Sequence, residues 1–331
     1  MKSAITFLLL MFLAVAGAGH SSSTPRKAET APVSGPAYVP LTDWAKASHL
    51  EFHWLKRDET LQLNNHSSKV VLAVDSREAQ INGVAVWLLF PAVARNGALW
   101  LAQLDADLTL RALLSPPKGR SKARIRTICL DPGHGGKDPG NRVGSKQEKQ
   151  YTLLLAEELR AQLTRAGFKV TLTRSTDKFI ELPTRPELAK RRGADVFISL
   201  HFNASDTERN SVQGSEVYCL TPAGASSTNS RGEGACVGAF PGNRHNGLNL
   251  FLAYQLQKAL TRNLTVEDRG VRRARFAVLR DAAMPAALIE AGFMSHPAEG
   301  RKIFTSAYRQ KMARAILEGL LAYKRAVEPG A

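Results

Sequence analysis

Beyond residue 124 the chain alternates between short apolar runs and longer runs whose apolar residues recur at helical spacing. The short runs are typical of strands and lie at 125–130, 168–173, 196–201, 214–220 and 287–290. The helical runs lie at 149–166, 185–192, 248–261 and 308–323. Strands joined by helical crossovers form parallel sheets with helices on their faces. This part of the chain is therefore predicted to be an α/β domain, with a mostly parallel sheet covered by helices on both faces.

Three histidine or acidic residues stand where these strands end, and a fourth precedes a helix. His134 follows the first strand within Asp-Pro-Gly-His-Gly-Gly, a turn whose glycines let a ligand approach closely. His201 and Glu290 end their strands, and Glu148 precedes the first helical run. In open α/β sheets ligands bind beyond the carboxyl ends of the strands. We therefore expect His134, His201 and Glu290 at one ligand-binding edge.

Six segments in this order resemble the catalytic domain of the zinc-dependent N-acetylmuramoyl-L-alanine amidases. They are Leu-Asp-Pro-Gly-His-Gly-Gly at 130–136, Glu148, Ser-Leu-His-Phe-Asn-Ala at 199–204, Arg-Gly-Val at 269–271, Val-Leu-Arg at 278–280 and Ile-Glu-Ala-Gly-Phe-Met-Ser at 289–295. The resemblance spans about 124–325. It implies a hydrolase that cuts the amide bond between N-acetylmuramic acid and the L-alanine of the peptidoglycan stem peptide. Peptidoglycan is thus the implied partner, and Zn²⁺ the implied cofactor.

The same resemblance implies roles for the four residues. His134, Glu148 and His201 match the zinc ligands, and two histidines with a glutamate are a known set that leaves a fourth position for water. Glu290 matches the catalytic carboxylate, which takes a proton from that water and passes it to the leaving nitrogen. For Asp131 two uses stay open: a hydrogen bond that orients His134, or a local cap of the Pro-Gly turn.

Two other functions also stay open at this point. A zinc peptidase that cuts peptidoglycan cross-links would keep the same metal site. A wall-binding regulator without catalysis would keep only the fold, and loss of Glu290 would be its mark. Glu290 is present in this chain, which favours an enzyme.

The first forty residues have the pattern of an exported protein. Residues 1–18 contain Lys2, an apolar run and small residues suited to a signal peptidase. The apolar run is shorter than the roughly 20 residues that span a bilayer. Residues 19–40 are rich in Ser, Pro and Ala and are predicted to be a flexible tether. We therefore expect a periplasmic or secreted protein with no transmembrane segment after signal cleavage.

Residues 41–114 carry short alternating apolar runs, with an Asn82-Gly83 hairpin signal between two of them. This region is similar to the copper amine oxidase N-terminal-like domain, which implies a small α+β domain without a metal site. Such a domain is expected to bind a wall polymer or a protein activator. Residues 115–123 are predicted to be a linker with few contacts across it.

Charge and composition add three expectations. The formal net charge of +16 favours polyanionic partners, but the basic residues are scattered, so nucleic acid is not expected and an anionic wall or membrane surface is. A merely solubilising charge is the equal alternative. Segment 221–246, rich in Gly, Ser and Asn, is predicted to be a mobile loop near Glu290. Cys129 and Cys219 are predicted core residues, and Cys236 lies in that loop.

Overall fold

The computed structural model describes residues 35–116, 124–228 and 238–328. Residues 36–331 belong to one compact unit. The predicted signal peptide, most of the tether, most of the linker and Cys236 lie outside the described residues. Within the described ranges, no helix combines the length and the apolar composition that crossing a membrane requires.

One sheet of eleven strands contains strands from both parts of the chain, in the order β12-β9-β13-β16-β14-β15-β6-β5-β4-β3-β2. Its strands are β2 (Glu51–Lys56), β3 (Thr60–Asn64), β4 (Lys69–Ala73), β5 (Glu78–Ile81), β6 (Val84–Trp87), β9 (Thr127–Pro132), β12 (Lys169–Leu172), β13 (Val196–Asn203), β14 (Ser215–Leu220), β15 (Asp268–Ala274) and β16 (Ala286–Phe293). A smaller sheet joins β1 (Tyr38–Pro40), β8 (Ala98–Ala102) and β7 (Val93–Arg95), and a short hairpin joins β10 (Arg142–Val143) to β11 (Lys146–Gln147).

The large sheet is mixed, so the prediction of a mostly parallel sheet is wrong. Strands β12, β9, β13 and β16 run parallel to one another. Strand β14 is antiparallel to β16, and β2 to β6 pair with one another in antiparallel fashion. The reversal at β14 has a simple cause. A strand that returns in the same direction as the one before it needs a long crossover, whereas the connection from β13 to β14 is short and contains no helix.

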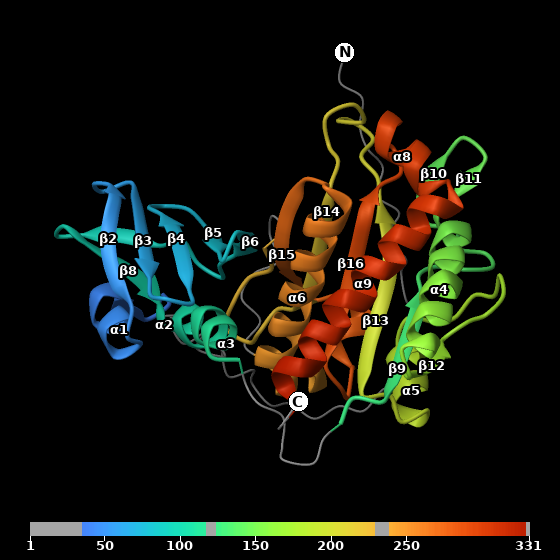
Figure 1. Cartoon of the computed structure of the whole chain (residues 1–331), viewed down its shortest axis with the longest axis horizontal. Coiled ribbons are helices and arrows are strands. Elements are labelled where there is room, and N and C mark those ends of the chain that lie inside the picture. Colours follow the sequence, from blue (N-terminus) through green and yellow to red (C-terminus); the bar gives the residue numbers. More distant parts are fainter. Residues whose placement is uncertain (1–34, 117–123, 229–237, 329–331) are drawn as a thin grey trace, which may run out of the picture. The chain divides into compact units, whose positions relative to one another are not determined.

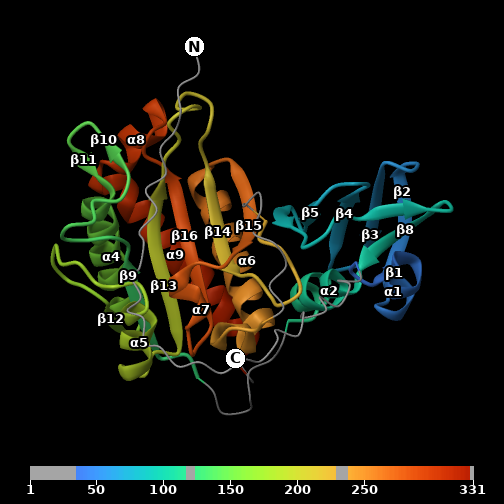
Figure 2. The ribbon, with the colours of Figure 1, turned by 180° about the vertical axis from the view of Figure 1, so that it is seen from behind.

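Long helices cover one face of the sheet. The helices are α1 (Leu41–Ala47), α2 (Gln103–Asp105), α3 (Arg111–Leu114), α4 (Glu148–Arg165), α5 (Thr184–Arg191), α6 (Asn246–Leu264), α7 (Ala277–Arg280), α8 (Pro297–Ile303) and α9 (Ser306–Val327), with a π-helical turn at Ala106–Leu110 and a 3₁₀ turn at Pro241–His245. Helices α4, α6 and α9 pack side by side over the strands (Figure 1). Seen from behind, the sheet carries the short helices α5 and α7 (Figure 2).

The two faces of β13 show how the fold separates its core from its site. Ile198 and Leu200 lie in the core beneath the long helices, whereas Phe197 lies in the second core on the other face. Side chains alternate along a strand, so His201 shares the side of Phe197. Cys129, a buried free cysteine as expected, also belongs to the second core. The site residue on β13 therefore points away from the long helices.

The two parts of the chain share more contacts than the linker suggests. Strand β6 pairs with β15. The hydroxyl of Tyr254 donates to the carbonyl of Ile81 at 3.1 Å, and Arg273 donates from two nitrogens to Thr109 Oγ1, each at 3.1 Å. Tyr254 and Arg273 are buried, so these contacts belong to the core. The prediction of few contacts across 115–123 is wrong, because a polar linker does not reveal which surfaces its neighbours bury.

The connection after β14 also departs from its prediction. Because β14 is antiparallel to β16, its last residues lie opposite the start of β16 rather than its end. The described start of segment 221–246 therefore leaves β14 at the end away from Glu290, in contrast to the prediction. Thr221 and Thr228 are buried, so the first part of the segment is packed against the domain. Residues 229–237 lie outside the described ranges.

Candidate active site

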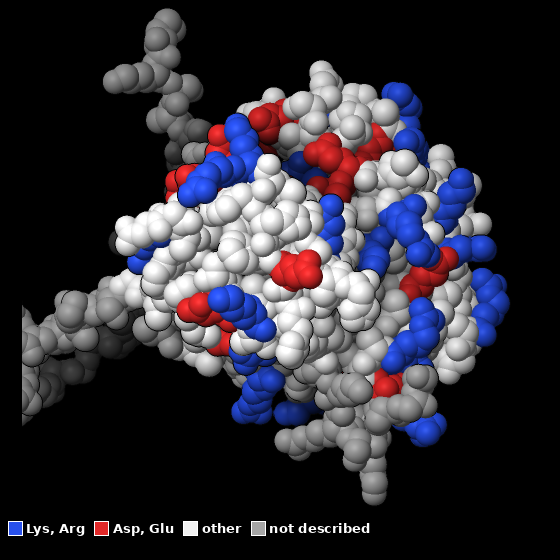
Figure 3. All heavy atoms as spheres, turned by 60° about the vertical axis from the view of Figure 1, so that its left-hand side comes forward, with Lys and Arg blue, Asp and Glu red and all other residues white. Residues whose placement is uncertain are grey.

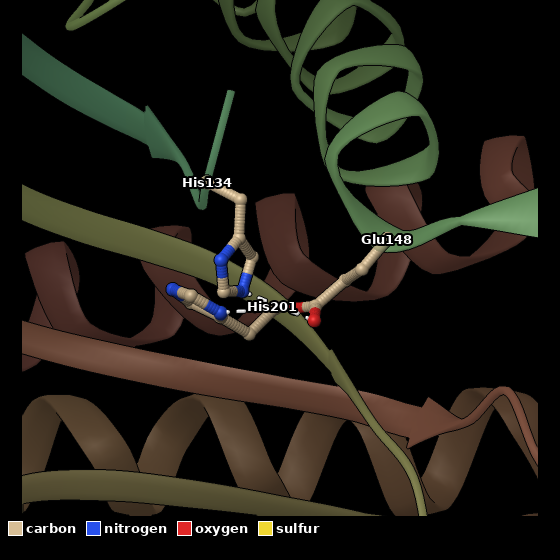
Figure 4. Close-up of side chains that lie close together, drawn as sticks. All are labelled: His134, Glu148 and His201. Atoms are coloured by element: carbon tan, nitrogen blue, oxygen red, sulfur yellow. Dashed lines mark hydrogen bonds and ion pairs between the residues drawn. The ribbon is translucent and has the colours of Figure 1, made fainter. Parts of the chain in front are cut away.

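Three of the residues singled out in the sequence meet at one end of the sheet (Figure 4). His134 lies on the loop after β9, Glu148 begins α4, and His201 lies near the end of β13. One carboxylate oxygen of Glu148 is 3.0 Å from His134 Nε2, and the other is 3.0 Å from His201 Nδ1. One potential ligand atom from each residue lies within 4.8 Å of the others. Two imidazoles and a carboxylate thus converge on one point.

Two glycines make this convergence possible. A Cβ atom on Gly133 would lie 2.3 Å from His201 Cε1, and one on Gly140 would lie 2.5 Å from Glu148 Oε2. Both distances are far below van der Waals contact, so a side chain at Gly133 would displace the His201 ring and one at Gly140 would displace the Glu148 carboxylate. The glycines therefore give room to the site's own side chains, as well as shaping the turn.

Glu148 is buried and is held in its ionised form. Its Oε1 accepts a hydrogen bond from the backbone N–H of Phe202 at 3.1 Å, and its Oε2 accepts one from the backbone N–H of Asn141 at 2.9 Å. Burial alone would raise the pKa of Glu148, but hydrogen bonds from His134 and His201 outweigh it. The pKa of this carboxyl therefore lies well below its ordinary value.

Asp138 is the carboxylate that holds His134, and the sequence did not point to it. Nδ1 of His134 lies 2.8 Å from Asp138 Oδ2, and the Gly140 amide donates to the other oxygen at 3.0 Å. Burial lowers the pKa of His134, but the carboxylates of Glu148 and Asp138 outweigh burial and raise it overall. Asp138 thus fixes the ring and leaves Nε2 directed at Glu148.

Asp131 serves neither of the two uses expected of it. It is fully buried, accepts hydrogen bonds from Thr173 at 2.6 Å and Ser199 at 2.8 Å, and pairs with Arg185 at 2.8 Å. Arg185 also donates to the backbone carbonyl of His134 at 2.9 Å. Asp131 therefore holds Arg185 in place, and Arg185 in turn holds the backbone of the loop that carries His134.

Glu290 lies in the middle of a row that crosses three strands. In β16 it pairs with His201 of β13 on one side and with Glu216 of β14 on the other. Paired residues point to the same face. Its Oε2 is buried and has no hydrogen-bond partner among the described residues. Burial raises the pKa of Glu290 well above its ordinary value, and the charges of Glu148 and Glu216 raise it further. A carboxyl with a raised pKa holds a proton more firmly than an ordinary one, as a general acid must.

Glu216 continues the row and is firmly paired. Its Oε2 lies 3.0 Å from Arg272 Nε and 3.4 Å from Arg269 Nε. Its Oε1 accepts hydrogen bonds from Tyr218 at 2.9 Å and Asn203 at 3.1 Å. Sequence reasoning missed this cluster. One feature of the sequence could have indicated it. Asn203 and Arg269 fall inside segments 199–204 and 269–271, which carry the resemblance, and neither residue had an assigned role.

The residues present fit a catalytic zinc ion. Two histidines and one glutamate form a known ligand set that leaves a position open. The second nitrogen of a metal-binding histidine is commonly held by a carboxylate, as Asp138 holds His134 here. Glu290 lies beside the set, and its Oε2 is unpaired within the described ranges. The roles of these residues stay predictions.

The surface charge is spread rather than gathered. On the face shown in Figure 3, blue Lys and Arg side chains occur at several separate places, with red Asp and Glu side chains among them. Several of the exposed basic residues belong to ion pairs, such as Arg111 with Asp107 and Arg262 with Glu318. This distribution agrees with the scatter of basic residues along the sequence.

Comparison with protein families and curated proteins identifies relatives of both parts of the chain. Residues 128–322 match the family described as N-acetylmuramoyl-L-alanine amidase, and residues 23–104 match the copper amine oxidase N-terminal domain. The amidase AmiC of Neisseria meningitidis serogroup B is 34% identical over 241 residues, covering 66% of this chain and 57% of that protein. The amidase AmiA of Escherichia coli K12 is 34% identical over 233 residues, covering 63% of this chain and 80% of that protein. This chain thus spans little more than half of the Neisseria relative.

Solved amidase structures resemble the same part of the chain. An amidase of Clostridium difficile 630 has a TM-score of 0.50 and 31% identity, covering 61% of this chain and 97% of that one. AmiC2 of Nostoc punctiforme has a TM-score of 0.50 and 32% identity, with coverages of 61% and 99%. CwlD of Clostridioides difficile, solved in complex with the GerS lipoprotein, has a TM-score of 0.50 and 26% identity, with coverages of 60% and 98%. These matches confirm both resemblances drawn from the sequence, and the chain belongs to the N-acetylmuramoyl-L-alanine amidase family.

Proposed function

We propose that this protein is a cell-wall hydrolase that cleaves the amide bond between N-acetylmuramic acid and L-alanine with zinc-activated water. In this proposal His134, Glu148 and His201 are the zinc ligands, and Glu290 is the general base and acid. The observation that carries it is the meeting of three donor atoms within 4.8 Å, beside a glutamate whose buried oxygen lacks a partner among the residues that the structure describes.

The chain's own residues divide the work of this reaction. When bound, zinc supplies a Lewis acid that lets water lose a proton near neutral pH. Glu290 accepts that proton and later delivers it to the nitrogen of the departing L-alanine. Its raised pKa suits this use, because a carboxyl with an ordinary pKa would hold the proton too weakly to deliver it. Asp138 keeps the ring of His134 oriented throughout.

Two kinds of variant separate metal binding from chemistry. His134→Ala and His201→Ala should each lower zinc content, because a site reduced to two protein ligands holds metal poorly. Glu290→Gln should keep its zinc, while turnover falls by roughly 100-fold to 10,000-fold, the usual loss for a general acid or base. Glu187→Gln, on exposed α5, is a matched control that should change neither.

The assays are metal content by atomic emission and mass spectrometry of purified peptidoglycan digested by the mature protein. Free stem peptides that begin with L-alanine indicate the amidase reaction. Shortened cross-links would indicate a peptidase instead, and no release by any variant would favour a regulator. A Glu290→Gln protein without zinc would make Glu290 a ligand, and one with full activity would remove it from the mechanism.

We also propose that the protein works outside the cytoplasm, in the periplasm or as a secreted protein, because peptidoglycan lies there. A fusion to a reporter that is active only after export tests this location. The first domain is proposed to bind a wall polymer or a protein activator. The CwlD complex is a precedent for an amidase of this fold with a protein partner.

A further inference from the structure

A pocket of about 690 Å³ is lined by residues from both parts of the chain. Glu216, the last residue of the row His201–Glu290–Glu216, is one of them. Trp87 of β6 lines the pocket, together with Glu216 of β14 and Arg269 and Arg272 of β15. We propose that this pocket is a subsite for the stem peptide, where Arg272, seated on Trp87, binds a carboxylate of the second or third residue beyond the scissile bond. The inference rests on the proposed function and adds the first domain to the substrate site.

The side chain of Arg272 is fixed in the pocket through Nε, while its two terminal nitrogens stay available. Its Nε lies 3.0 Å from Glu216 Oε2 and donates to the Arg269 carbonyl at 3.2 Å. The centre of its guanidinium lies 4.2 Å from the ring centroid of Trp87. Within the described part of the chain, its two terminal nitrogens have no polar partner. An arginine fixed at Nε and stacked on an aromatic ring presents those nitrogens as a ready fork for a carboxylate.

Trp87 is held so that this stacking is part of the fold. Its Nε1 donates to the Arg269 carbonyl at 3.2 Å. Gly270 has a φ of +90°, and a Cβ there would lie 3.0 Å from Trp87 Cδ1. The Arg-Gly-Val segment of the amidase domain therefore packs closely against a tryptophan that the first domain supplies. Without the first domain, Arg272 would lose its stacking surface.

The charges around the pocket favour an anion. Three arginines and two glutamates are among its lining residues. Of the glutamates, Glu216 is already neutralised by Arg269 and Arg272, and Glu208 is exposed. The remaining positive charge suits a carboxylate. In the substrate, free carboxylates occur only on the peptide side of the scissile bond. The lactyl carboxyl of N-acetylmuramic acid is consumed in the scissile amide, whereas the stem peptide carries carboxylates beyond L-alanine.

The distance from Glu290 fits the same part of the substrate. Glu290 and Glu216 are paired, and Arg272 is paired with Tyr218, so all of them face the same side of the sheet. Strand β15 lies two strands from β16, about 10 Å at the usual spacing of neighbouring strands. An extended peptide covers about 3.3–3.6 Å per residue. Two or three residues therefore reach from the scissile bond to the Arg272 strand.

The test uses the full-length protein and two soluble substrates. One is an N-acetylmuramoyl tripeptide with free carboxylates on its second and third residues, and the other is the same compound with those carboxylates amidated. The unmodified protein should prefer the free acid in kcat/KM by about tenfold to a hundredfold, the usual worth of a charge-assisted hydrogen bond. Arg272→Gln should bring the ratio close to one, mainly through KM for the acid. Trp87→Leu should lower the ratio partway. Arg262→Gln, exposed on α6, is the control that leaves it unchanged.

Binding of the free tripeptide, followed by calorimetry, gives a readout that does not need turnover. Arg272→Gln should weaken that binding by about the same factor as the lost preference. If neither substrate is cut but the tripeptide binds through Arg272, the proposed function fails and the subsite stands. If the protein cuts both substrates equally well, the subsite is wrong and the function stands. An effect of Arg272→Gln without any effect of Trp87→Leu would remove the first domain from the site. Thermal unfolding of each variant shows whether it is folded.

Discussion

Replacing Asp138 tests how far a single carboxylate sets the metal affinity of this site. Asp138 lies 2.8 Å from His134 Nδ1, and the imidazole lowers the pKa of Asp138 despite a partial burial that would raise it. The carboxylate is thus ionised at neutral pH. Asp138→Asn keeps one acceptor oxygen, for the ring N–H or for the Gly140 amide but not for both, and removes the charge. Asp138→Ala removes both acceptors.

A hydrogen bond to a charged group contributes about 1.5–3 kcal/mol, which corresponds to roughly tenfold to a hundredfold in an equilibrium constant. Zinc affinity, measured by competition with a chelator of known affinity, should therefore fall by about that factor in Asp138→Ala. The fall should be smaller in Asp138→Asn. Asp206→Asn, an exposed position, is the matched control. An unchanged zinc affinity in Asp138→Ala would refute the view that Asp138 orients His134, and equal losses in both variants would show that the charge rather than the retained hydrogen bond matters.

Three further outcomes are expected. Gly140→Ala should lose zinc, because its φ is +64° and the new Cβ would lie 2.5 Å from Glu148 Oε2; metal analysis after dialysis checks this. Arg185→Met should lower the free energy of unfolding by about 3–5 kcal/mol in urea titration, because it leaves Asp131 buried without its ion-pair partner. Residues 124–325 made alone should keep their helical circular dichroism but melt at a lower temperature than the full chain, because β15 loses its partner β6; an unfolded fragment would contradict this.

The sequence could predict that the candidate site residues lie together because they obey a rule about strand ends. His134 follows β9, and His201 and Glu290 lie near the carboxyl ends of β13 and β16. These three strands are parallel to one another, so their carboxyl ends meet at one edge. This rule could not predict the direction in which β14 runs. Apolar residues in a strand report burial, and burial is the same whichever way the strand runs. The loop that follows therefore begins at the opposite edge from the predicted one.

Strand β15 was missed for a related reason. Its sequence contains Arg269, Arg272 and Arg273, which interrupt any apolar pattern. These arginines are accommodated because each has found a specific partner: Glu216 for the first two, and Thr109 of the first part for the third. A sequence shows the charges but not the partners that neutralise them. The contacts between the two parts of the chain were hidden in the same way.

The roles of the glutamates near the site follow from their neighbours rather than from their residue type. Glu148 receives two imidazoles and two backbone amides. Glu216 receives two guanidinium groups, a phenol and an amide. Glu299 accepts hydrogen bonds from the Phe293 and Gly214 amides. Each of these carboxylates is held by donors that would have to be broken before it could exchange a proton. Glu290 has a buried oxygen without a donor in the described structure, between two other negative charges that favour its protonated form. Of these four, it is the one whose proton can move at low cost, which is the physical requirement for the acid and base of the proposed reaction.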